Sequence, residues 1–271
     1  MNTHLHPGTA LITGASSGIG AVYADRLARS GYDLILVARR ADRLRALAQD
    51  ITSRTGRSVE AVSADLLDAV DLAKVEMLLK RDASITMLVN NAGIGATGPL
   101  LESHIGDMER MIALNVSVPT RLAYAAAPAF VGRGRGTIIN IASVVALAPE
   151  LLNGVYGGSK AYLLALTQSL QHELADKGVR VQAVLPGATA TDFWQLSGRP
   201  VESLPTEIVM RAEDMVDAAL SGLAQGETVT IPALPDAADW QAMENARKAL
   251  MPNLSRATPA ARYAIDLADA A

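Results

Sequence analysis

Residues 9–20 read TALITGASSGIG, a short apolar stretch that runs directly into a glycine-rich turn. The apolar stretch predicts a β-strand, and the residues from Gly18 to about Ser30 have the spacing of an amphipathic helix. Gly14, Gly18 and Gly20 would let backbone N–H groups approach a pyrophosphate at the start of that helix. A glycine cluster alone is also typical of a plain tight turn, so this interpretation depends on the rest of the chain.

The alternation of strand and helix continues along the chain. Further strands are expected over residues 33–38, 58–63, 86–90, 137–142, 179–185 and 228–231. Helices are expected over residues 41–54, 68–81, 154–174 and 212–224, with a long apolar-faced segment over 103–130. This alternation predicts an α/β fold: a single doubly wound parallel sheet of seven strands, of the Rossmann type, with helices on both faces.

Two segments depart from the alternation. Residues 192–210 have no clear periodicity, which predicts a loop that covers a site. Residues 236–271 follow two prolines and predict a short helical C-terminal extension. We therefore expect one domain over residues 1–271, with its core over about 8–232.

The composition argues against several functional classes. The net charge is −4 and half of the residues are apolar, so no basic stripe suggests nucleic acid and no polybasic patch suggests a membrane. Cysteine is absent, which excludes a thiol nucleophile and a disulfide framework. No apolar run approaches the roughly eighteen residues that span a bilayer, and we expect a cytoplasmic protein. His4 and His6 have no nearby carboxylates, and no metal site is expected.

The second predicted strand runs into Arg39 and Arg40. In dinucleotide-binding folds the end of this strand meets the adenosine ribose, where an acid favours NAD and an arginine accommodates the 2′-phosphate of NADP. Two arginines and no acid therefore favour NADP(H) over NAD(H), unless the arginines merely cap the strand at the surface. Ser16 and Ser17 in the glycine turn could add hydroxyl donors to the phosphates.

A serine and a tyrosine–lysine pair follow the fifth predicted strand. Tyr156 and Lys160 are four residues apart, so a helix over 154–174 places both on one face. An ammonium beside the phenol favours phenolate and would lower the phenol pKa toward neutrality. Ser143 would supply a neutral donor to the same substrate oxygen.

Three further positions could serve a ligand. Asp65, at the exit of the third strand, either contacts an adenine amino group or starts the next helix. Small residues after Asn90 would let a ligand pass close over the sheet edge. Pro119 cannot donate to the carbonyl of Asn115 one turn earlier, and that freed carbonyl could hold a water.

Taken together, the motifs resemble the classical short-chain dehydrogenase/reductase family over roughly residues 8–232. They are TGASSGIG at 13–20, NNAG at 90–93, Asn115, Ser143, YGGSK at 156–160 and PGATAT at 186–191. The resemblance implies an NADP(H)-dependent oxidoreductase that transfers a hydride between the nicotinamide and a carbonyl or secondary alcohol. It implies that Tyr156 is the general acid/base, Lys160 lowers its pKa and binds the nicotinamide ribose, Ser143 polarises the carbonyl, and Asn115 holds a relay water.

The same resemblance implies which residues contact the cofactor. They are, besides Tyr156 and Lys160, Gly14, Ser16, Ser17, Gly18, Ile19, Gly20, Arg39, Arg40, Asp65, Leu66, Asn91, Ala92, Gly93, Pro186, Gly187, Thr189 and Thr191. Many NADP-preferring members carry a basic residue where Ser17 stands, so the NADP preference depends mainly on Arg39.

We expect a small to medium, fairly apolar substrate. An apolar pocket would be lined by residues that could equally be plain core: Ile94, Val144, Val145, Leu151, Val155 and Trp194. The alternatives are a 3-oxoacyl thioester reductase and a non-catalytic NADP-binding regulator, and the intact Ser143, Tyr156 and Lys160 argue against the regulator. The resemblance implies a homodimer or homotetramer that associates through the helices holding Asn115 and Tyr156, and these helices are apolar over much of their length.

Overall fold

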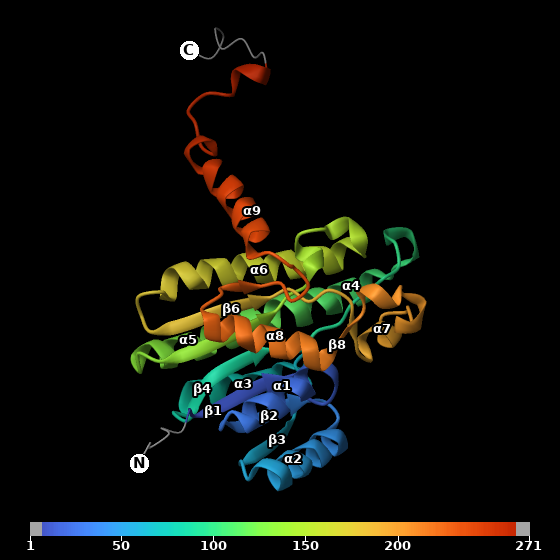
Figure 1. Ribbon diagram of the computed structural model, residues 1–271, viewed down its shortest axis with the longest axis vertical. Coiled ribbons are helices and arrows are strands. Elements are labelled where there is room, and N and C mark those ends of the chain that lie inside the picture. The colour runs from blue at the N-terminus through green and yellow to red at the C-terminus, as the bar shows by residue number, and fades with distance from the viewer. Residues whose placement is uncertain (1–6, 264–271) are drawn as a thin grey trace. The chain divides into compact units, whose positions relative to one another are not determined.

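The computed structural model describes residues 7–263 and contains a seven-stranded parallel sheet. The strand order is β3-β2-β1-β4-β5-β6-β9 (Figure 1). The strands are β1 (Thr9–Thr13), β2 (Asp33–Ala38), β3 (Val59–Ser63), β4 (Ile85–Asn90), β5 (Gly136–Ile141), β6 (Val179–Val184) and β9 (Val229–Thr230). The predicted doubly wound sheet is thus confirmed. His4 and His6 lie outside the described residues.

Helices cover both faces of this sheet because its central strands are apolar on both sides (Figure 1). One face packs against α3 (Ala69–Arg81), α5 (Val118–Gly132) and α6 (Gly154–Leu174). The other packs against α1 (Gly18–Arg29), α2 (Ala41–Thr55) and α8 (Ala212–Gln225). Strand order reverses between β1 and β4, and ligands bind at such a switch point beyond the carboxyl ends of the strands.

The segment expected to be continuous over 103–130 is interrupted. It consists of α4 (Ile105–Ile112), a π-helical turn (Ala113–Ser117) and α5. Pro119 has no N–H to donate to Asn115, and a π-turn accommodates such a break in the ladder. The buried Asn115 lies in this turn.

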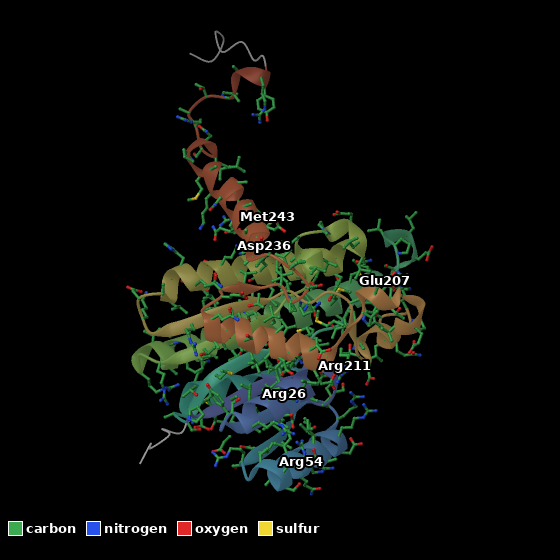
Figure 2. All side chains as sticks on the ribbon, viewed as in Figure 1. Arg26, Arg54, Glu207, Arg211, Asp236 and Met243 are labelled. Atoms are coloured by element: carbon green, nitrogen blue, oxygen red, sulfur yellow. The ribbon has the colours of Figure 1, made fainter. Side chains whose placement is uncertain are left out.

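Residues 192–210 are more structured than the expected loop. They contain α7 (Phe193–Leu196) and two 3₁₀ turns, Val201–Ser203 and Thr206–Ile208. Two short strands at the ends of this region, β7 (Thr189–Ala190) and β8 (Met210–Arg211), pair in parallel and close it into a loop. Glu207 and Arg211 lie near its end (Figure 2).

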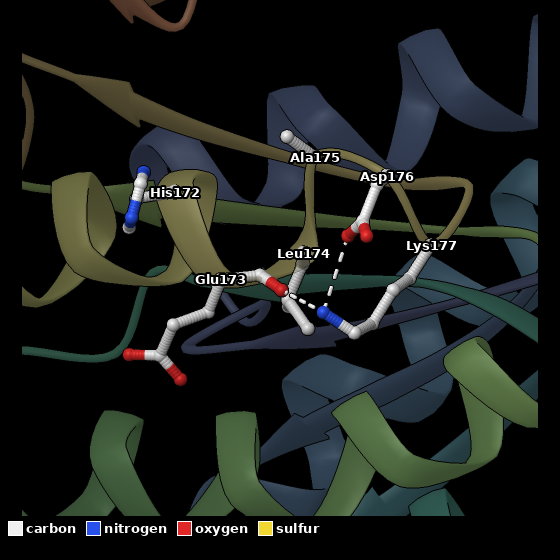
Figure 3. A pocket seen from close by; sticks show the side chains of 6 residues that line it. All are labelled: His172, Glu173, Leu174, Ala175, Asp176 and Lys177. Atoms are coloured by element: carbon white, nitrogen blue, oxygen red, sulfur yellow. Dashed lines mark hydrogen bonds and ion pairs between the residues drawn. The ribbon is translucent and has the colours of Figure 1, made fainter.

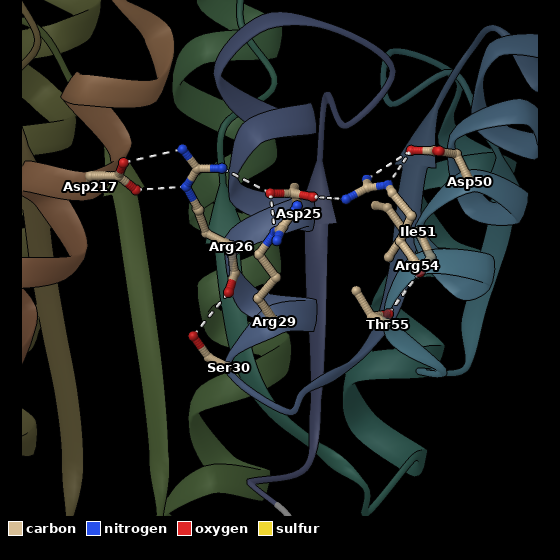
Figure 4. Close-up of polar contacts among 9 residues, drawn as sticks. All are labelled: Asp25, Arg26, Arg29, Ser30, Asp50, Ile51, Arg54, Thr55 and Asp217. Atoms are coloured by element: carbon tan, nitrogen blue, oxygen red, sulfur yellow. Dashed lines mark hydrogen bonds and ion pairs between the residues drawn. The ribbon is translucent and has the colours of Figure 1, made fainter.

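The helices on the α1 face are joined by an ionic network (Figure 4). Asp25 on α1 accepts hydrogen bonds from Arg26, Arg29 and Arg54, at 2.8, 2.8 and 2.6 Å. Arg26 also donates to both carboxylate oxygens of Asp217 on α8, at 2.7 and 3.1 Å. The network therefore links α1 to α2 and to α8.

The chain divides after Pro232 into two compact units. The second unit contains α9 (Ala237–Ala249), which carries Met243, and Asp236 caps that helix by accepting a 2.8 Å hydrogen bond from the Ala238 N–H (Figure 2). Within residues 7–263, no helix combines the length and apolar character needed to cross a membrane.

Candidate active site

Four predicted catalytic side chains are buried at the carboxyl end of the sheet. Ser143 follows β5, Tyr156 and Lys160 lie on α6, and Asn115 lies in the π-helical turn. The Lys160 ammonium donates to the carbonyl of Ile141 at 2.8 Å. The Ser143 hydroxyl lies close enough to the Tyr156 phenol to influence its pKa, and it also donates to the Pro186 carbonyl at 3.4 Å. Two hydroxyl groups therefore lie together where a substrate oxygen could accept from both.

The pKa shifts in this group are governed by burial. Burial raises the pKa of Tyr156 to about 12, and the nearby Ser143 hydroxyl acts in the opposite direction. Burial also lowers the pKa of Lys160 to about 8. The expectation of a lowered phenol pKa is therefore wrong in direction, because desolvation of the buried ring outweighs the polar contacts around it.

Asn115 joins three parts of the site. Its amide oxygen accepts from the Ile94 N–H at 3.0 Å, and its amide nitrogen donates to the Ile94 carbonyl at 2.8 Å and to Ser159 on α6 at 3.1 Å. A Cβ added at Gly93 would lie 3.1 Å from the Asn115 oxygen and 3.6 Å from the Lys160 ammonium. Asn115 thus holds the segment after β4 against α6, and its role in holding a water stays a prediction.

The glycine turn forms a cradle in front of α1. Gly14 and Gly18 have left-handed φ angles of 65° and 53°. A Cβ at Gly14 would lie 2.8 Å from the Asn91 amide nitrogen, which donates to the carbonyls of Thr13 and Gly14 at 2.9 and 3.2 Å. A Cβ at Gly20 would lie 2.5 Å from the Gly14 carbonyl oxygen. Ser17 makes no side-chain cap and the first turn holds no acid, so the helix N-terminus suits a phosphate.

Both predicted arginines follow β2, and the structure distinguishes them. The Arg40 guanidinium donates to the Ser17 hydroxyl at 3.0 Å and to the Ser16 hydroxyl at 3.3 Å. The exposed Arg39 lies beside Ser63, whose hydroxyl donates to the Arg39 carbonyl at 3.2 Å. Arg40 therefore contacts the glycine turn directly, whereas the sequence analysis gave more weight to Arg39.

The remaining cofactor candidates include several structural residues. Asp65 accepts from the Leu67 N–H at 3.0 Å, which shapes the turn before α3. Asp68 caps α3, so the alternative in which Asp65 starts that helix is wrong. The side chains of Leu66, Ile19 and Ala92 pack against the two core clusters. The Pro186 carbonyl accepts from Ser143 at 3.4 Å, and the Gly187 carbonyl accepts from the Thr189 hydroxyl at 3.2 Å.

The segment after Gly187 crosses the front of the cradle. A Cβ at Gly18 would lie 3.1 Å from the Thr191 methyl carbon, so Thr191 faces the glycine turn. The Thr189 carbonyl accepts a hydrogen bond of 3.0 Å from the indole N–H of Trp194. The structure thus brings Thr191 close to the cradle and holds Thr189 through the predicted pocket residue Trp194.

An apolar cluster surrounds the phenol of Tyr156. It includes three of the predicted pocket residues, Ile94, Val145 and Val155, together with five that were not predicted: Ala96, Met108, Met111, Leu152 and Phe193. Leu151 is 63% exposed and, like Val144, lies outside the cluster. Phe193 lies two residues after Thr191, but nothing in the irregular spacing of 192–210 indicated where its ring would point.

A surface hollow of about 510 Å³ lies elsewhere, at the C-terminal end of α6 (Figure 3). It is lined by His172, Glu173, Leu174, Ala175, Asp176 and Lys177. The ammonium of Lys177 donates to the Glu173 carbonyl and to the Asp176 carboxylate. Tyr156 is about 24 Å away along the helix, and none of the predicted site residues lines the hollow.

Comparisons with known proteins agree with this geometry. A family model described as short chain dehydrogenase matches residues 8–200, and the chain belongs to the short-chain dehydrogenase/reductase family. The expectation from the motifs is confirmed at this level. Among the residues that the structure describes, no group of three His, Cys, Asp or Glu side chains could hold a metal ion.

Individual relatives refine the comparison. A short-chain dehydrogenase from Sphingobium yanoikuyae in complex with NADPH is 50% identical, with a TM-score of 0.92, and the match covers 94% of this chain and 99% of that one. A bulky-bulky ketone specific alcohol dehydrogenase from Comamonas testosteroni is 44% identical, with a TM-score of 0.88 and coverage of 96% and 99%. A very-long-chain 3-oxoacyl-CoA reductase from Coccidioides immitis is 36% identical over 65% of this chain and 52% of its own.

Proposed function

We propose that the protein is an NADP(H)-dependent oxidoreductase that reduces ketones and oxidises the corresponding secondary alcohols, with Tyr156 as the general acid/base. The observation that carries this proposal is the burial of the Ser143 and Tyr156 side chains close to one another, together with Lys160, at the carboxyl edge of the sheet. The glycine cradle lies at the same edge.

The chemistry follows from what each side chain can donate. When bound, NADPH supplies the hydride that reduces the carbonyl carbon. Ser143 and Tyr156 would donate to the carbonyl oxygen as negative charge develops there, and Tyr156 would transfer its proton to give the alcohol. A phenol with a pKa of about 12 is protonated at neutral pH, which suits ketone reduction.

The residues present fit the proposed cofactor. The uncapped N-terminus of α1 and the close-packed glycines Gly14 and Gly20 would hold the pyrophosphate. Arg39 and Arg40 would accommodate the 2′-phosphate, with Arg40 already oriented by Ser16 and Ser17. The NADPH complex of the Sphingobium relative supports the same cofactor.

Bulky, apolar ketones are the proposed substrate class. The Comamonas relative is specific for bulky-bulky ketones. In the present chain, exposed apolar side chains stand on the segments that contribute to the Tyr156 cluster, and we call them the apolar rim: Ile105 on α4, Leu151 before Leu152, and Leu196 on α7. Asn153 donates to the Gly98 carbonyl at 2.8 Å and Thr97 to the Ser197 carbonyl at 2.8 Å, so residues 97–98 are joined to the segments at 153 and 197. An apolar rim favours an apolar substrate.

A 3-oxoacyl thioester reductase is the second candidate, and the Coccidioides relative supports it. Thioesters of coenzyme A or of an acidic carrier protein carry negative charge, which a basic entrance would attract. Glu102, Glu150 and Glu202 are exposed on the elements near the apolar rim, and they favour an uncharged ketone instead. A non-catalytic regulator would have no need of the buried Ser143–Tyr156 pair.

The test is the rate of NADPH oxidation, followed by absorbance, with a panel of small ketones, diaryl and aryl alkyl ketones, and 3-oxoacyl thioesters. We expect the highest kcat/KM for the bulky ketones, and NADP⁺ reduction with the matching alcohols. No oxidation with any carbonyl compound would overturn the proposed activity. Faster turnover of thioesters than of ketones would replace it with the second candidate.

A further inference from the structure

Phe193, the first residue of α7, lies against the ring of the proposed acid. The centroids of the Phe193 and Tyr156 rings are 5.7 Å apart, with an angle of 41° between their planes. On its other side Phe193 meets Trp194 edge-on, at 5.8 Å and 88°. Tyr156 is only 6% exposed, and the Phe193 ring is one of the groups that cover it.

Gly95 provides the recess in which the Phe193 ring sits. A Cβ added at Gly95 would lie 2.2 Å from Cζ of Phe193 and 2.6 Å from Cε2. No side chain can occupy position 95 while the ring is in place, because such a separation is far inside van der Waals contact. Glycine at position 95 is therefore required for the Phe193 ring to lie where it does.

The two neighbours of Phe193 are held with different strength. Trp194 is buried, and its indole N–H donates to the Thr189 carbonyl at 3.0 Å. Asp192 makes an ion pair of 3.6 Å with Arg43, in which both side chains are more than half exposed, and such pairs contribute little. The ring thus lies between a fixed residue and a weakly held one, on a helix of four residues.

We propose that Phe193 determines how large a substituent the site accepts on the substrate carbonyl, with Gly95 as the recess that receives its ring. The inference rests on the proposed function, because it names the wall of that same site. A carbonyl that reaches the Tyr156 hydroxyl brings one of its two substituents against the Phe193 ring. Removing that ring enlarges the space beside the acid and leaves the residues Ser143, Tyr156 and Lys160 themselves unsubstituted.

The experiment measures kcat/KM for aryl alkyl ketones whose alkyl group grows from methyl to butyl, with wild type and with Phe193→Ala. We expect the butyl-to-methyl ratio of kcat/KM to rise about tenfold to a hundredfold in Phe193→Ala. Phe193→Leu serves as a second variant if the alanine variant fails to fold. Its butyl-to-methyl ratio of kcat/KM should lie between those of wild type and Phe193→Ala.

Gly95→Ala tests the recess. When Phe193 is present, the added methyl group displaces its ring and should change the butyl-to-methyl ratio of kcat/KM by about fivefold or more. When Phe193 is already replaced by alanine, the same Gly95→Ala substitution should change that ratio by less than about twofold. Gly98→Ala is the matched control, because a Cβ there would meet only the Ser103 hydroxyl, at 3.9 Å. We expect the control to keep the wild-type ratio.

The outcomes separate the two proposals. If wild type reduces no ketone, the proposed function is overturned and the role of Phe193 with it. If wild type reduces ketones but Phe193→Ala and Phe193→Leu lower kcat/KM equally for every ketone, Phe193 is a packing residue and only this inference is overturned. Equal effects of Gly95→Ala with and without the Phe193 ring would also count against it.

Discussion

The ammonium of Lys160 donates to the backbone carbonyl of Ile141 at 2.8 Å, where β5 ends. Lys160 is 6% exposed, and its nitrogen lies 5.8 Å from the centroid of the Tyr156 ring. A neutral carbonyl compensates poorly for the water that a buried ammonium loses, so the pKa of Lys160 falls to about 8. The buried lysine should therefore make stability depend on pH.

We predict that the free energy of unfolding rises between pH 8 and 10 through Lys160. In this window the unfolded chain keeps the lysine proton while the folded protein releases it, so the unfolded state binds more protons. From pH 8 to pH 10 the free energy of unfolding of wild type should increase by about 2 kcal/mol more than that of Lys160→Met, as measured by urea titrations. Above pH 10 the raised pKa of Tyr156 lowers the free energy of unfolding, because the tyrosine of the unfolded chain loses its proton at a lower pH than that of the folded protein. Lys248→Met, at an exposed position, should follow wild type; parallel wild-type and Lys160→Met curves would contradict the prediction.

Tyr156→Phe should keep cofactor binding and lower turnover by about 10²- to 10⁴-fold, because ring packing survives while the transferable proton does not. The measurement is kcat on a good ketone, with the Kd for NADPH from fluorescence titration. Tyr162→Phe, on the same helix and 39% exposed, is the control and should retain wild-type kcat. Near-normal turnover of Tyr156→Phe would mean that another group donates the proton.

NADPH should bind more tightly than NADH. A guanidinium–phosphate pair contributes roughly 1.5–3 kcal/mol, or about ten- to a hundredfold in affinity. Arg39→Asp should reverse the order by repelling the phosphate and accepting from the ribose hydroxyls. Paired dissociation constants for each variant provide the measurement, and Arg40→Ala tests the arginine that contacts Ser16 and Ser17. Equal affinities of wild type for the two cofactors would remove the basis for the NADP assignment.

Asp25→Asn should destabilise the protein by about 1–2 kcal/mol, since the carboxylate holds three partly exposed arginines at 28–58% exposure. Desolvation acts to raise the pKa of Asp25, but the hydrogen bonds from Arg29, Arg54 and Arg26 outweigh it and lower the pKa to about 2. This stabilisation should be present above about pH 4 and lost as the pH falls toward 2.

Urea denaturation at pH 7 and pH 3 measures the Asp25 effect. Asp176→Asn is the control, because the carboxylate of its ion pair with Lys177 is far more exposed than that of Asp25 and should contribute little to stability. Equal losses for the two variants would mean that the network does not contribute as a unit.

We expect a homodimer or homotetramer that associates through α5 and α6. Tyr124 on α5 is 67% exposed, and Tyr162 on α6 meets Thr120 of α5 at 2.9 Å between their hydroxyl oxygens. Exposed aromatic side chains on adjacent helices are typical of interfaces. Light scattering should give twice or four times the chain mass, and Tyr124→Glu should lower it. A wild-type monomer at micromolar concentration would refute this.

The sequence alone determined the architecture and the placement of Tyr156 and Lys160 on one helix face. Alternation of strand and helix is a local property, visible in the periodicity of apolar residues and in the glycines and prolines between segments. The strand Thr9–Thr13 and the helix Gly154–Leu174 have their predicted bounds. Tyr156 and Lys160 share a helix face because they are four residues apart, which requires no knowledge of other segments.

Only the tertiary structure decided the contacts between distant segments and the degree of burial. Phe193 meets Tyr156 and Gly95 through the path of an irregular segment, which no periodicity encodes. Arg40 rather than Arg39 contacts Ser16 and Ser17, because the chain turns between β2 and α2. The raised pKa of Tyr156 depends on how much water the whole fold removes from the phenol. Desolvation is set by every segment packed around a group, whereas spacing along the chain reports only its local neighbours.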